Sequence, residues 1–123
     1  MTRSNIFAAT VVLSWLGFFV HNLADLPGQS IASPESLYPT VVFALLLALW
    51  YLPKLRTIAT WLLLVWAILH LVGGAMLSVL PLPFLPFAPE QSLYHYLFHA
   101  LYGALQVPLI VLCVRRLRRR EPE

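Results

Sequence analysis

Apolar residues along this chain gather into four long runs, separated by short segments rich in proline, glycine and charge. The runs cover approximately residues 5–24, 34–52, 57–80 and 89–114. A helix needs about 20 residues, each rising about 1.5 Å, to cross about 30 Å of hydrocarbon, and each run has roughly that length. The runs are too long for strands and lack a two-residue alternation. The pattern therefore predicts an all-α fold, an integral membrane bundle of four transmembrane helices.

Composition supports a membrane environment. Of the 123 residues, 60% are hydrophobic and only 11% are charged, whereas a soluble domain has about 25% charged residues. The chain cannot cover a soluble surface with charge, so the lipid bilayer is its expected partner, and no nucleic-acid partner is expected. No polar segment is long enough for a second domain, so residues 1–123 are expected to form one transmembrane domain with a basic tail at 115–123. The lone Cys113 excludes an internal disulfide and a CxxC site.

The basic residues predict the orientation of this bundle. Arg3 precedes the first run, and Lys54 and Arg56 lie between the second and third. Five more follow the fourth run: Arg115, Arg116, Arg118, Arg119 and Arg120. The acidic residues between the helices fall on the opposite side: Asp25, Glu35 and Glu90. The positive-inside rule then places both termini in the cytoplasm. We expect a multi-pass protein of the cell membrane, with a bacterial inner membrane as its compartment, and an arginine tail that anchors the chain at the lipid surface.

The first run has an alternative interpretation, because a basic start followed by an apolar stretch is also typical of a cleaved signal peptide. The candidate cleavage region ends at Ala24, and the position two residues before it is Asn22, which is not small. We therefore expect the first helix to be retained.

Prolines shape the predicted connections. The short turn at residues 53–56 makes the second and third helices antiparallel neighbours. Residues 81–89 carry four prolines among apolar side chains, which excludes a regular helix and favours an extended path. This segment is expected to lie in the interfacial layer or over the outer end of the bundle; a lid over a site is the alternative. Pro108 predicts a kink in the fourth helix.

The four histidines form the main candidate for chemistry. His21, His70 and His99 lie on three different predicted helices, all roughly 20–24 Å from the cytoplasmic end, and His95 lies one turn further out. Residues 95, 99, 102 and 106 share one helix face. Polar side chains at membrane depth must face protein, water or a ligand. The sequence therefore predicts a polar interior in the outer half of the bundle.

Two cofactors fit such a cluster. His95 and His99, four residues apart, can bind one transition-metal ion from a single helix, with His21 or His70 completing the set. Asp25 is expected to ligate the ion or to orient a histidine.

A b-type haem would instead use His70 and His99 on facing helices. Tyr102 and Gln106 are expected to hydrogen-bond to the residues that hold either cofactor. The sequence does not decide between haem and a metal ion.

Two other classes of function stay open. The histidines can serve only as interhelical hydrogen-bonding groups in a structural or assembly protein, or they can belong to a proton or ion pathway formed by an oligomer. The sequence has no nucleophile elbow, phosphate-binding glycine loop or HExxH motif, so an autonomous enzyme is not expected. We expect a subunit or accessory factor of a membrane complex, with a membrane-protein partner or a second copy of itself.

Overall fold

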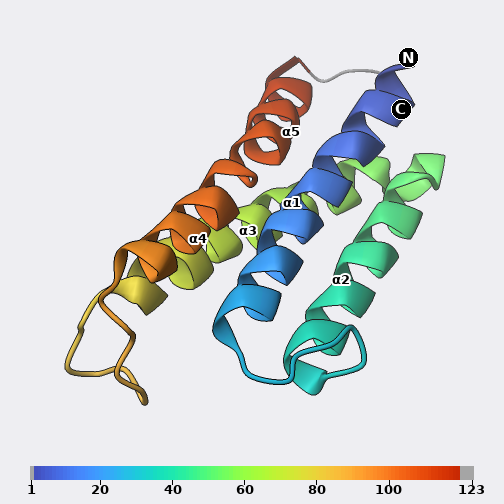
Figure 1. Ribbon diagram of the computed structural model, residues 1–123. Helices are drawn as coiled ribbons and strands as arrows, with labels where there is room; N and C mark the ends of the chain where they lie inside the picture. Colours follow the sequence, from blue (N-terminus) through green and yellow to red (C-terminus); the bar gives the residue numbers. More distant parts are fainter. Residues whose placement is uncertain (1, 120–123) are drawn as a thin grey trace.

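The computed structural model describes residues 2–119, which form helices arranged in four rods that pack side by side (Figure 1). The first two rods are single helices, α1 (Arg3–Asp25) and α2 (Pro34–Trp50). The third rod begins with the short 3-10 helix η1 (Pro53–Leu55) and continues as α3 (Arg56–Leu69), the π-helix η2 (His70–Met76) and the 3-10 turn η3 (Leu77–Val79). The fourth consists of α4 (Leu93–Ala104) and α5 (Val107–Arg119). The described residues contain no strand, so the all-helical, four-helix prediction is confirmed.

Three of these rods are long and apolar enough to cross a membrane. They are α1, the continuous segment Pro53–Val79 and the segment Leu93–Arg119. Helix α2 is apolar but has only 17 residues, because Leu52 is extended before Pro53, as a residue that precedes proline tends to be. The surfaces of the rods are rich in exposed leucine, valine and isoleucine, which suits contact with lipid.

Two serines stand directly before helices and bond differently. Ser33 is the N-cap residue of α2, but its hydroxyl accepts a hydrogen bond from the Ser30 amide (3.0 Å) and does not cap the helix. Helix α4 begins at Leu93 and not near residue 89, because the Ser92 hydroxyl accepts a hydrogen bond from the His95 amide (3.2 Å). A serine that satisfies a free amide in this way is a strong helix start.

The predicted kink in the fourth helix is present as a break between α4 and α5. Pro108 has no N–H to donate to the preceding turn, and the chain makes a turn at residues 105–106. The fully buried Gln106 joins this turn to α1. Its Nε2 donates to the carbonyls of Ser14 and Tyr102 (both 3.0 Å), and its Oε1 accepts from the Ser14 hydroxyl.

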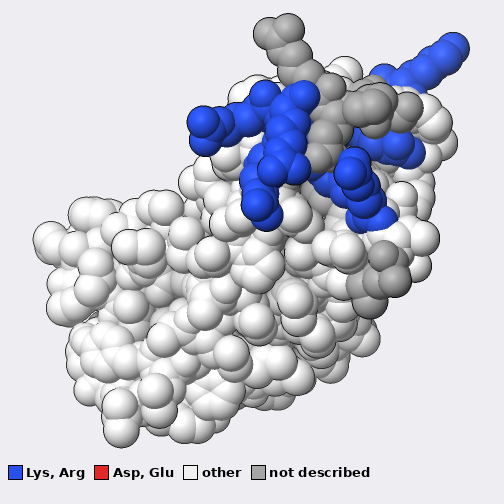
Figure 2. Space-filling view, turned by 90° about the horizontal axis from the view of Figure 1, so that it is seen from above, with Lys and Arg blue, Asp and Glu red and all other residues white. Residues whose placement is uncertain are grey.

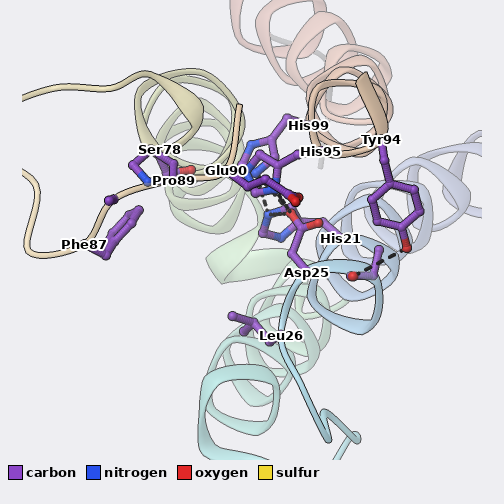
Figure 3. A pocket seen from close by; sticks show the side chains of 12 residues that line it. His21, Asp25, Leu26, Ser78, Phe87, Pro89, Glu90, Tyr94, His95 and His99 are labelled. Carbon is purple, nitrogen blue, oxygen red and sulfur yellow. Dashed lines mark hydrogen bonds and ion pairs between the residues drawn. The ribbon is translucent and has the colours of Figure 1, made fainter. Parts of the chain in front are cut away.

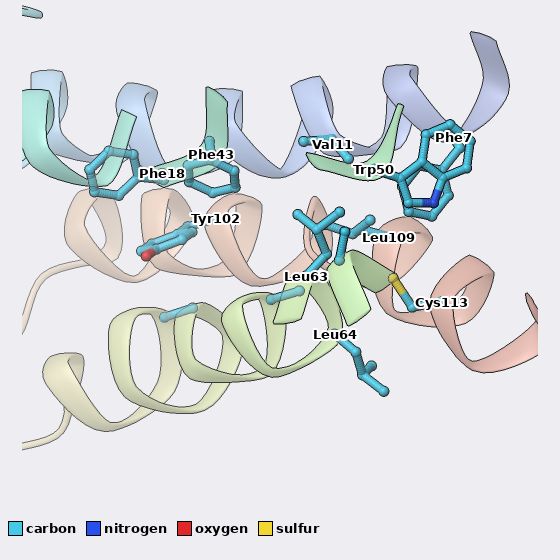
Figure 4. Packing of buried hydrophobic residues seen from close by; sticks show 13 residues of the cluster. Phe7, Val11, Phe18, Phe43, Trp50, Leu63, Leu64, Tyr102, Leu109 and Cys113 are labelled. Atoms are coloured by element: carbon cyan, nitrogen blue, oxygen red, sulfur yellow. The ribbon is translucent and has the colours of Figure 1, made fainter. Parts of the chain in front are cut away.

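The apolar core runs along the bundle, from Trp50 near the basic end to Phe18 and Phe43 further along (Figure 4). Phe7 stacks on Trp50 with ring centroids 4.2 Å apart, and Leu63, Leu109 and Cys113 are completely buried beside them. Towards the other end the interior becomes polar and includes buried histidine.

The described lysine and arginine residues gather at one end of the molecule, seen from above in Figure 2. Arg116 lies over the rings of Phe7 and Trp50, at 5.0 and 5.1 Å from their centroids, and its Nη2 donates to the Arg3 carbonyl (3.1 Å). This joins the start of α1 to α5. Arg120 of the predicted anchor lies outside the described residues.

Candidate metal centre

A cluster of histidine and aspartate lies at the end of the bundle opposite the arginines. His21 and Asp25 occupy the last turn of α1, and His95 and His99 lie on the first two turns of α4, which packs against α1 (Figure 3). His21 Nε2 is 2.9 Å from Asp25 Oδ2 and 2.9 Å from His99 Nε2. His99 Nε2 is 3.2 Å from the same Asp25 oxygen. Two helices thus bring three potential ligand atoms to one point.

Asn22 fixes the protonation pattern of the His21 ring. The Asn22 amide nitrogen donates to the Ser36 hydroxyl (3.0 Å) and to the Glu35 carbonyl (3.3 Å) on α2, so its oxygen Oδ1 must be the atom that faces His21 Nδ1 at 3.1 Å. An amide oxygen only accepts hydrogen bonds. His21 therefore carries its proton on Nδ1, and in the neutral ring the Nε2 atom presents a lone pair.

The π-helix η2 does the same for His99. The His99 Nδ1 atom lies 3.0 Å from the Ala75 carbonyl oxygen, which can only accept, so Nδ1 carries the proton and Nε2 presents a lone pair. Single π-helical turns are frequent at functional sites. Here the turn contains the pair Gly73 and Gly74 and supplies the carbonyl that orients a candidate ligand.

When both rings are neutral, three acceptor atoms meet at this point. Asp25 Oδ2 is buried and receives no hydrogen bond from any residue in the described part of the chain. Buried acceptors that face one another are unfavourable unless a cation lies between them. A tetrahedral zinc ion with bonds of about 2.0–2.1 Å separates its ligand atoms by about 3.3 Å. The observed separations of 2.9–3.2 Å are a few tenths of an ångström shorter, so small ring rotations admit the ion.

His95 completes the group from one turn further along the bundle. Its Nδ1 lies 3.4 Å from Asp25 Oδ2, and its ring centroid is 4.5 Å from that of His99. Its Nε2 is buried and has no hydrogen-bond partner among residues 2–119. His95 is thus near the three converging atoms but is not oriented as they are.

His70, predicted as a central ligand, is not brought into this group. Its Nδ1 is hydrogen-bonded to the Tyr102 hydroxyl, and its ring packs against Phe18, Phe43 and Trp66 with centroids 5.3, 5.2 and 4.6 Å away. Tyr102 stands between the two parts, since its ring also lies 4.9 Å from that of His21. The sequence placed His70 at the right depth, but the direction of its side chain depends on the packing of α2 and α3.

A cavity of about 540 Å³ opens beside the cluster (Figure 3). His21, Asp25, His95 and His99 form its inner wall. The opposite wall comes from the proline-rich connection between η3 and α4, through Phe87, Ala88, Pro89 and Glu90. The last residues of that connection thus lie beside the cluster, while the connection as a whole projects beyond the ends of η3 and α4 (Figure 1).

The structure adds two groups that the sequence analysis missed. Asn22 is a polar residue buried within an apolar helix, and such residues usually mark function, so this signal was available. Nothing in the sequence marked the Ala75 carbonyl as part of the site, apart from the pair of glycines that precedes it. Gln106, expected near the ligands, bonds to Ser14 and not to a histidine.

Comparisons with protein-family models, with curated proteins and with solved structures find no match to this chain. Within the described residues, His21, Asp25 and His99 form a group that could hold a metal ion.

Proposed function

We propose that this protein is a small integral membrane protein that binds one divalent transition-metal ion through His21, Asp25 and His99. The observation that carries the proposal is the convergence of three lone-pair atoms, two of which belong to rings whose protons are held elsewhere. Two imidazoles and a carboxylate are ligands suited to zinc, copper, iron or nickel. Zinc fits the near-tetrahedral spacing best.

The proposed orientation has four membrane spans and both termini in the cytoplasm. The clustered arginines and Lys54 support it, because positive charge stays on the cytoplasmic side. The metal site then lies near the outer surface, where the cavity admits an ion without a passage through the hydrocarbon. Helix α2, with 17 residues, is at the short end of the range for a spanning helix.

A haem between His70 and His99 has less support. Such a cofactor would have to break the hydrogen bond of His70 to Tyr102 and that of His99 to the Ala75 carbonyl, or coordinate through the other ring nitrogens. The Nε2 of His99 already faces His21 and Asp25. The ring of His70 is enclosed by three aromatic side chains.

The ion would join α1 to α4 at the end of the bundle where the interior is polar. Binding energy for an ion held by groups from two helices is also folding energy. An ion that stabilises the outer end of the bundle suits a subunit or accessory factor of a membrane complex, because that end must keep one conformation to bind a partner.

The test is metal analysis of the intact chain, purified in a mild detergent, together with its absorption spectrum. We expect about one zinc ion per chain after exposure to zinc and removal of the excess. His21→Ala and His99→Ala should each lose the ion. His70→Ala is the matched control: it removes a buried histidine at similar depth but should retain the ion. Gel filtration and circular dichroism confirm that each variant is folded.

Two results would contradict the proposal. A folded wild-type chain that takes up no zinc, copper, iron or nickel would show that the protein has no metal centre. A haem absorption band that disappears in both His70→Ala and His99→Ala would assign the site to haem.

A further inference from the structure

We infer that His95 is an exchangeable fourth ligand, and that a small carboxylate with an apolar body, bound in the adjoining cavity, can take its coordination position. This inference rests on the proposed metal centre. It concerns what occupies the fourth position of an ion held by His21, Asp25 and His99.

Within residues 2–119, His95 is the histidine of the cluster whose ring no hydrogen bond orients. His21 and His99 are each fixed through Nδ1, by Asn22 and by the Ala75 carbonyl. The His95 side chain is only 13% exposed, and its Nε2 atom is buried without a partner among the described residues. Coordination through the other ring nitrogen, Nδ1, would leave Nε2 as the protonated atom, so no hydrogen bond from the described residues would hold the ring in place.

The position of His95 allows its ring both to coordinate the ion and to dissociate from it. Its Nδ1 is 3.4 Å from Asp25 Oδ2, close to the spacing of about 3.3 Å between ligands of a tetrahedral ion. His95 is outside the group of ligand atoms, those of His21, Asp25 and His99, that lie within 4.8 Å of one another. It lies in the first turn of α4, directly after the proline-rich connection, and helix ends open more readily than helix centres.

The cavity is much larger than a coordinated water requires. Its volume of about 540 Å³ compares with roughly 30 Å³ for one water and lies in the range of small-molecule sites, about 300–1,000 Å³. Leu26, Phe87 and Pro89 give it apolar walls. Such walls favour a molecule with an apolar body, placed so that one polar end reaches the ion.

Charge favours an anionic donor. A divalent ion with the single carboxylate of Asp25 and two neutral imidazoles has a net charge of +1, which is unfavourable beside apolar walls. Neutral His95 leaves this charge unchanged, whereas a carboxylate ligand cancels it. Glu90 also lines the cavity and is exposed, so its own carboxylate is the competing donor that an experiment must separate.

Cobalt(II) provides the test, because its visible spectrum reports the number and type of its ligands. The cobalt-loaded chain in detergent is titrated with hexanoate and, separately, with acetate. We expect a saturable spectral change with both, and at least about tenfold tighter binding of hexanoate, since each buried CH₂ contributes roughly fourfold. His95→Ala and His95→Phe should bind hexanoate at least about tenfold more tightly than wild type, because the competing ligand is gone.

Tyr96→Phe is the matched control, since Tyr96 follows His95 on α4 but does not line the cavity. It should leave the affinity for hexanoate unchanged. A wild-type spectrum that hexanoate does not alter would overturn the exchange. Cobalt spectra and hexanoate affinities that stay unchanged in both His95 variants would show that His95 is not a ligand. A tighter binding of hexanoate in Glu90→Gln alone would assign the exchangeable donor to Glu90. Failure of cobalt, zinc and copper to bind at all would refute the metal centre itself, a distinct result.

Discussion

The Nε2 atoms of His21 and His99 lie 2.9 Å apart, although neither atom carries a proton when both rings are neutral, because each Nδ1 faces a hydrogen-bond acceptor. Asn22 on one side and the Ala75 carbonyl on the other create this arrangement, and Asp25 adds a third acceptor. Residues outside the ligand set therefore determine that the cluster suits a cation.

Asn22→Leu should weaken zinc binding by about 10- to 100-fold, because loss of a group that orients a ligating histidine has this effect. The leucine removes the acceptor for His21 Nδ1–H, so the ring can rotate or shift its proton to Nε2. A competition titration with a chromogenic chelator measures the affinity.

Ser36→Ala is the control for that change. It removes one of the two acceptors that hold the Asn22 amide nitrogen but leaves the oxygen that faces His21, so the loss should be much smaller. Equal losses in both variants would mean that Asn22 acts through the contact between α1 and α2 and not through the His21 ring.

Gly74→Ala should lower the free energy of unfolding by about 1–3 kcal/mol, the usual effect of overpacking. A Cβ at this position would overlap the Tyr102 hydroxyl oxygen and lie 2.9 Å from its ring. Unfolding in detergent with added SDS, followed by circular dichroism, measures the change.

Gly73→Ala is matched to it, one residue earlier in the same π-helix. A Cβ there meets no atom within 4 Å, so the substitution should be neutral or stabilising by up to about 1 kcal/mol. If the two variants were equally destabilised, the π-helical backbone itself, and not the space for Tyr102, would require glycine.

Gln106→Leu should lower the free energy of unfolding by about 1–3 kcal/mol, because the Ser14 hydroxyl and two buried carbonyls lose a partner. The leucine has a similar volume, so loss of hydrogen bonds and not a cavity is tested. A double-mutant cycle with Ser14→Ala should give a coupling of about 0.6–1.7 kcal/mol, as for interhelical hydrogen bonds in membranes. Additive effects would show that the two side chains do not depend on each other.

The proposed orientation predicts which connections a membrane-impermeant maleimide can reach in intact cells. In a Cys113→Ala background, Ser30→Cys in the α1–α2 connection should be labelled from outside. Lys54→Cys, between α2 and α3, should be labelled only after the membrane is opened. The reverse pattern would place the arginines outside and overturn the assignment of both termini to the cytoplasm.

Much of the fold follows from local pattern. The length and apolarity of the four runs are enough to predict four helices, because hydrocarbon leaves a backbone few other ways to satisfy its hydrogen bonds. Pro108 was enough to predict the break between α4 and α5. The exact helix starts were less predictable, because Ser33 and Ser92 are both plausible caps and only the surrounding turn decides which hydroxyl bonds to which amide.

The sequence by itself placed His21, His70 and His99 at similar depth, since a constant rise per residue converts position in the chain into height. It could not decide which of them converge. That depended on the rotation of α1 against α4, which brings His21 and Asp25 to His99, and on aromatic packing from α2 and α3, which turns His70 towards Tyr102. The protonation of the two ring nitrogens likewise depended on an amide and a carbonyl from other turns, because a hydrogen bond is specified by atoms in space and not by spacing along a chain.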